Sequence, residues 1–175
     1  MAKRLKEQTK TTVASNQLKT RIIRWLQESG LYTGPQTQPD MNFAILGRFP
    51  KQVPPPGQSL PFYILNPVED PSQITVVANV NLAQEHRTVL QGLDETERER
   101  FVSELKIELL FRCQFNFRQD ERTKEYLGIQ LAETIFLDPP LTKNTLFKTV
   151  ERIFLAYILI SLRVQELVPS VELSQ

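Results

Sequence analysis

The segment from Leu146 to Leu162 constrains the fold of this chain more than any other part of the sequence. Its apolar residues recur at the three- and four-residue spacing of a helix that packs on a core: Leu146, Phe147, Val150, Ile153, Phe154, Tyr157, Ile158 and Leu162. Further apolar residues follow on the other side of the same helix: Leu155, Ala156, Leu159, Ile160 and Val164. A helix that is apolar nearly all round must be buried from more than one direction. We therefore expect a second copy of the chain, or another protein, to cover part of it.

The residues expected at that interface are Leu155, Leu159, Ile160 and Val164 of the last helix, together with Trp25. Trp25 is the only tryptophan and shares an apolar helix face with Leu18, Ile22 and Leu26. Packing in a core or an interface explains such a tryptophan better than stacking on a ligand does.

Regular structure is expected only from Ser15 or Asn16 onward, because both are good helix N-caps. Residues 1–14 carry scattered cations and no apolar periodicity, which predicts a disordered basic tail. Residues 15–168 then form a single domain, and residues 169–175 a C-terminal tail. Gly30 is placed to end the first helix in a left-handed conformation.

The remaining pattern predicts an α+β fold with the element order α-βββ-α-ββ-α. Strands are expected at residues 41–46, 60–65 and 74–80, which form an antiparallel meander, and at 113–117 and 127–137. Helices are expected at 82–111, with a fresh N-cap at Asp94, and after Thr142 or Asn144. The proline-rich stretch at 50–57 is interpreted as a stiff connection between two strands. The predicted sheet is mostly antiparallel, with the helices packed against it.

The composition argues against several classes of protein. With 21 basic and 20 acidic residues the formal net charge is +1, whereas dedicated nucleic-acid binders usually have a strongly basic face. The single cysteine excludes an internal disulfide, and the polar start of the chain lacks the apolar region of a signal peptide. We expect a cytoplasmic protein that does not enter a membrane. A nucleic-acid-associated role through the basic N-terminal region, including Lys19, Arg21 and Arg24, is the alternative.

The sequence contains no catalytic signature. His86 is the only histidine, so one chain cannot form a two-histidine metal site, and we interpret it as a residue at a helix surface or rim. Cys113 alternates with Phe115 and Phe117 in a strand, which indicates a buried apolar role rather than a nucleophile paired with His86. The glycine-rich phosphate-binding motifs are absent. We expect no enzyme activity, no metal and no cofactor.

The chain resembles proteins with the type III secretion chaperone-like fold, which also includes YbjN-type proteins and uncharacterised prokaryotic families. The resemblance covers about residues 15–168. It rests on the element order, the strands containing ILG, FYIL and ITVVANV, the L-D-x-x-E-R helix start at residues 93–98, and the long last helix. It implies a homodimer that binds extended segments of other proteins. The function expected is therefore a non-enzymatic, dimeric protein-binding module, chaperone-like or regulatory.

Overall fold

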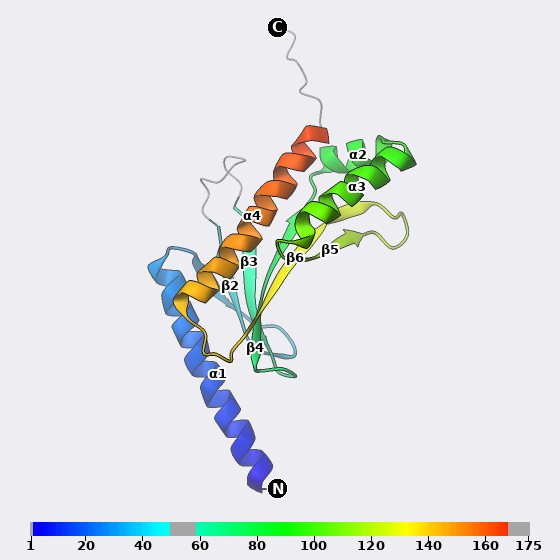
Figure 1. Cartoon of the computed structure of the whole chain (residues 1–175). Coiled ribbons are helices and arrows are strands. Elements are labelled where there is room, and N and C mark those ends of the chain that lie inside the picture. The colour runs from blue at the N-terminus through cyan, green and yellow to red at the C-terminus, as the bar shows by residue number, and fades with distance from the viewer. Residues whose placement is uncertain (1, 50–58, 168–175) are drawn as a thin grey trace.

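The computed structural model describes residues 2–49 and 59–167, with side chains from Ala14 onward. The fold is α+β, as predicted, and its elements follow one another as α1 (Ala2–Glu28), β1 (Tyr32–Gln36), β2 (Met41–Arg48), β3 (Pro61–Pro67), β4 (Gln73–Asn81), α2 (Gln84–Gly92), α3 (Glu95–Leu110), β5 (Gln114–Gln119), β6 (Tyr126–Phe136) and α4 (Lys143–Leu167) (Figure 1). The proline-rich stretch at 50–57 and the tail at 169–175 lie outside the described residues.

A single antiparallel sheet of six strands has the order β1-β2-β3-β4-β6-β5 (Figure 1). Strands β1 to β4 pair with their neighbours in sequence, as expected of a meander. The hairpin of β5 and β6 then joins through β6, whose Gly128 pairs with Asn81 and whose Phe136 pairs with Gln73. This arrangement leaves β1 and β5 at the two edges.

The core lies between the helices and one face of the sheet. Alternate residues of β3 and β4, among them Phe62, Ile64 and Val76, are fully buried on that face. The apolar faces of α1, α3 and α4 cover them in one continuous cluster. On the opposite face, Tyr63 and Val77 are only half-buried, since the side chains of a strand alternate between its two faces.

Helix α1 begins far earlier than the expected cap at Ser15 or Asn16. It runs from Ala2, and its first half extends beyond the sheet as a rod (Figure 1). The prediction of a disordered segment over 1–14 thus differs from the structure, where the backbone of residues 2–14 is helical. The early residues are mostly good helix formers without glycine or proline, so nothing interrupts the helix before Ser15. Instead of capping the helix, Ser15 is buried within it.

The predicted end of α1 and the predicted beginning of α3 are confirmed. Gly30 has a φ of 69°, and the N–H groups of Gly30 and Leu31 donate to the carbonyls of Gln27 and Leu26, which closes α1 in a Schellman motif. Asp94 caps α3 by accepting a hydrogen bond of 2.8 Å from the N–H of Glu97. The fresh N-cap at Asp94 therefore separates α2 from α3.

Candidate functional site

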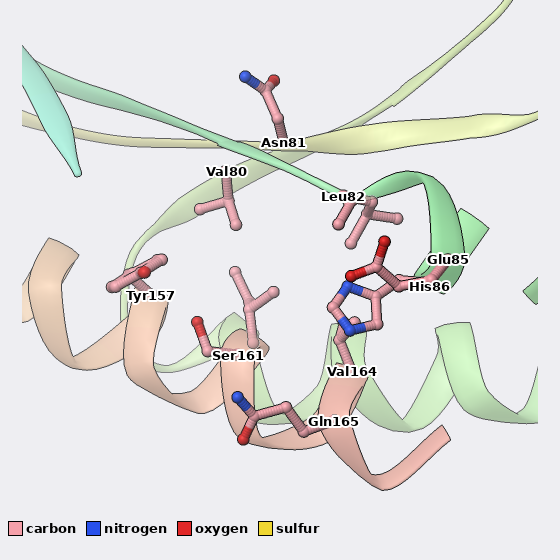
Figure 2. Close-up of a pocket in the computed structure, with 11 residues that line it drawn as sticks. Val80, Asn81, Leu82, Glu85, His86, Tyr157, Ser161, Val164 and Gln165 are labelled. Carbon is pink, nitrogen blue, oxygen red and sulfur yellow. The ribbon is translucent and has the colours of Figure 1, made fainter. Parts of the chain in front are cut away.

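A pocket of about 420 Å³ opens where the end of β4 meets α2 and the C-terminal half of α4 (Figure 2). Three elements supply its walls because β4 runs directly into α2, and α2 packs on α4. The eleven lining residues are Val80, Asn81, Leu82, Ala83, Glu85, His86, Tyr157, Ile160, Ser161, Val164 and Gln165.

The pocket has an apolar floor and a polar rim. Val80, Ile160 and Val164 form the floor and belong to the core. Glu85 and Gln165 are exposed at the rim, whereas the amide of Asn81 points away from the pocket (Figure 2) and accepts a hydrogen bond from Arg118. This division is typical of small-molecule sites, which are mostly apolar with a few convergent polar groups.

His86 is at the rim of this pocket, as its position in the sequence predicted, and it is half-buried. Figure 2 shows its imidazole directed into the pocket, on the same side as the carboxylate of Glu85. The polar groups opposite had no signal in the sequence, since Tyr157 belongs to an apolar stripe and Ser161 only interrupts an apolar run. These two residues are one helical turn apart on α4, which places both on the pocket side.

Cys113 does not meet His86, because it lines a different hollow beside Phe111, Phe115 and Glu133. The thiol packs against the core, as its strand pattern predicted. Burial, and next the neighbouring Glu133 carboxylate, raise the pKa of Cys113 to about 11. The group is therefore a neutral thiol at physiological pH, which is unfavourable for a nucleophile.

The predicted interface residues of α4 divide into two groups. Ile160 and Val164 are only 1 % and 4 % exposed, so their assignment to an outer interface is wrong: they face the sheet and α2. Leu155 is 47 % exposed and Leu159 is half-buried, as an interface requires. Leu162, expected in the core stripe, is instead 52 % exposed. The buried face of α4 includes the small residues Thr149 and Ala156. The helix is therefore rotated about its own axis relative to the orientation that its large residues suggested.

Helix α3 adds exposed apolar residues beside these. Arg163 of α4 donates from Nε to both carboxylate oxygens of Glu108 on α3, at 3.0 and 3.2 Å. The hydrogen bonding from Arg163 lowers the pKa of Glu108. Ile107 of α3 and Phe111, the residue that caps its C-terminus, lie close to Glu108 in the sequence. Leu159 and Leu162 likewise lie within one turn of Arg163 on α4. Phe111 is 88 % exposed. We call the set Ile107, Phe111, Leu155, Leu159 and Leu162 the α3–α4 surface.

Trp25 is not part of the α3–α4 surface. Its half-buried ring packs at the edge of the core, and the guanidinium of Arg21 lies 5.2 Å from the ring centre. The ion pair of Glu28 with Lys143, at 2.6 Å, places the end of α1 at the beginning of α4. Leu155 lies twelve residues further along α4, about 18 Å at the helical rise. The structure therefore separates Trp25 from the other predicted interface residues.

The part of the chain that the structure describes contains neither a cluster of metal ligands nor a membrane-spanning helix. No three side chains of His, Cys, Asp or Glu converge there in a way that would hold a metal ion. Nor is any helix among residues 2–49 and 59–167 long and apolar enough to cross a membrane.

The sequence from 18 to 163 matches the family described as "Uncharacterized conserved protein (DUF2299)". The chain belongs to this family. The expected membership of an uncharacterised family is thereby confirmed, and none of the curated proteins matches the chain.

Two solved structures are similar to this member of the DUF2299 family. An uncharacterized protein from Methanothermobacter thermautotrophicus has a TM-score of 0.73 and 20 % identity, over 84 % of this chain and 96 % of that one. YbjN from E. coli has a TM-score of 0.44 and 11 % identity, over 84 % of this chain and 88 % of that one. The archaeal protein shares the fold.

Proposed function

We propose that this DUF2299 protein is a non-enzymatic protein-binding module that forms a homodimer through the α3–α4 surface. The exposed phenyl ring of Phe111, together with Leu155 and Leu162 across the Glu108–Arg163 pair, is the observation that supports it. A cluster of large apolar side chains in contact with water is unfavourable, and such clusters commonly mark protein interfaces.

The charges around the α3–α4 surface favour a second copy of the chain as the partner. In a two-fold interface the same surface of each chain meets that of the other. Charges at its rim can attract one another only if the surface carries both signs. Exposed Glu104 and Lys106 lie on α3, and exposed Glu151 and Arg152 on α4. Of the two cations, Lys106 also lies over the ring of Phe117 and Arg152 also pairs with Glu133. The chain is also nearly neutral, with 21 basic and 20 acidic residues, so two copies do not strongly repel one another.

The mass in solution tests the dimer. Size-exclusion chromatography with light scattering is expected to give twice the 20.2 kDa of one chain, over roughly 1 to 100 µM, where a micromolar dissociation constant is measurable. Phe111→Asp is expected to shift the mass to that of the monomer, because it buries a charge at the centre of the interface.

Val68→Asp is the matched control, since Val68 is also an exposed apolar residue but lies between β3 and β4. It should leave the dimer intact. A monomeric wild-type protein at the highest concentration would contradict the proposal, and so would a dimer that survives both Phe111→Asp and Leu155→Asp.

Fewer observations support a nucleic-acid role for the N-terminal region than support the dimer. Of its cations, Arg21 is engaged with the ring of Trp25, and Glu28 lies near Arg24 at the end of α1. Fluorescence anisotropy with labelled single- and double-stranded oligonucleotides separates the two proposals. Binding that weakens steeply with salt and is lost in Lys19→Glu with Arg24→Glu would favour nucleic acid.

A further inference from the structure

We propose that the pocket lined by His86 and Tyr157 binds a small organic amine, with an ammonium group at the rim and an apolar body on the floor. The site is separate from the α3–α4 surface, although both use α4: the pocket takes the side of the helix that faces β4 and α2. The proposal is therefore independent of dimer formation.

The floor of the pocket suits a ring or a branched aliphatic group. Val80, Ile160 and Val164 are held in place by the core around them, so the cavity does not depend on flexible side chains. Its volume of about 420 Å³ lies within the range of roughly 300–1,000 Å³ that is usual for ligand sites. Burying an apolar group there removes it from water without having to reorganise the fold.

Polar groups at the pocket have free hydrogen-bonding capacity. Within the described part of the chain, the side chains of His86, Tyr157 and Ser161 make no hydrogen bond that meets ordinary geometry. Figure 2 shows these side chains around the same hollow. Such groups around an apolar floor fix the orientation of a ligand.

The charge of the lining selects the kind of ligand. Glu85 is the only lysine, arginine, aspartate or glutamate among the eleven residues, and its carboxylate lies at the rim (Figure 2). The N-terminus of α2 opposes it with a partial positive charge of about half a unit. The full negative charge of Glu85 exceeds this, so a cation is favoured over an anion.

The single histidine offers a direct measurement of binding. The proton NMR signals of the His86 ring are followed while phenethylamine, 2-phenylethanol or 3-phenylpropionate is added; these probes share a phenyl ring and differ in charge. We expect the amine to shift the signals at the lowest concentration and the carboxylate at the highest. Glu85→Gln is expected to weaken amine binding roughly twofold to fivefold, the usual effect of an exposed charge pair.

Ser161→Leu fills the pocket and is expected to abolish binding of phenethylamine. Ser103→Leu, the same change at an exposed site of α3, is the control and should bind normally. Thermal unfolding of each variant shows whether it is folded, and Glu85→Gln tests the charge without altering the core. The proposal is overturned if the carboxylate binds more tightly than the amine, if no probe shifts the His86 signals, or if a folded Ser161→Leu protein still binds the amine.

Discussion

The side-chain amide of Asn66 is fully buried, and both its oxygen and its nitrogen are hydrogen-bonded. Its Oδ1 accepts from Ser15 at 3.2 Å and from Asn42 at 3.1 Å, while its Nδ2 donates to the carbonyls of Gln73 at 2.7 Å and Pro71 at 3.3 Å. A buried polar group is tolerated when it is hydrogen-bonded in this way. Through Ser15, the amide connects α1 to the turn between β3 and β4.

Asn66→Ala is expected to destabilise the protein by about 1–3 kcal/mol or more, because it leaves buried hydrogen-bonding groups without a partner. Urea unfolding, monitored by circular dichroism, gives the free energy of unfolding. Asn116→Ala serves as a control at an exposed position of β5, and its effect should stay within roughly 0.5 kcal/mol. Equal effects of the two changes would show that the Asn66 hydrogen bonds do not stabilise the fold.

The pair of Glu108 and Arg163 makes stability depend on pH. The hydrogen bond from Arg163 holds the pKa of Glu108 below its ordinary value of about 4.5 in the folded chain. A lowered folded-state pKa stabilises the protein above the unfolded-state value, and that contribution is lost as the pH falls through the folded-state value.

Glu108→Gln should therefore lower the melting temperature at neutral pH, and its difference from wild type should shrink as the pH falls below about 4.5. Thermal melts across this range measure the effect. Glu104→Gln, an exposed change one turn earlier on α3, should show no such convergence. A constant difference for Glu108→Gln would mean that the ion pair does not cause its effect.

At the scale of elements, the sequence predicted the five apolar strands but not β1, which is mostly polar. Strand β1 contains Gly34 and Pro35, both rare within strands, so its sequence does not predict a strand. Its place at an edge explains why it tolerates them: it needs to pair only with β2, where Pro35 lies opposite Ile45. Edge pairing is a tertiary property and leaves no periodic signal in the chain.

The orientation of α4 was only partly predictable. Periodicity identified Leu146, Val150, Ile153 and Tyr157 as core residues, and all four are buried. The helix is apolar on several sides, so the pattern did not show which further residues face the sheet. The small side chains of Thr149 and Ala156 decide this by allowing close contact. The pocket depends on this orientation, so its polar residues could not be located from the sequence.

Strand β6 depends on a glycine where it pairs with the end of β4. A Cβ atom added at Gly128 would lie 2.2 Å from the backbone carbonyl oxygen of Val80, and a strand backbone cannot move aside without breaking its pairing. Gly128→Ala is expected to cost roughly 1–3 kcal/mol, as other overpacked sites do. Gly34→Ala is the control, since a Cβ atom added at Gly34 would have nothing within 4 Å. Urea unfolding that shows the same loss for both would contradict this account.

At the scale of the whole molecule, the long helix α1 has a part that packs and a part that extends beyond the sheet (Figure 1). Leu18 is the first buried apolar residue of the described chain, and Ile22 and Leu26 continue its face. Deletion of residues 2–13 is therefore expected to change the melting temperature less than Leu18→Ala does in the full chain. A larger loss on deletion would show that the first half of the helix takes part in the fold.

The pairing of β4 with β6 gives the chain a particular order of assembly. Residues 82–125 separate the two strands, and α4, which packs across both, follows every strand in the sequence. While the protein is being synthesised, the meander of β1–β4 leaves the ribosome with only α1 against its apolar face, and the core closes only when α4 emerges. The nascent chain thus exposes an aggregation-prone surface late into synthesis, the stage at which cellular chaperones bind unfinished domains.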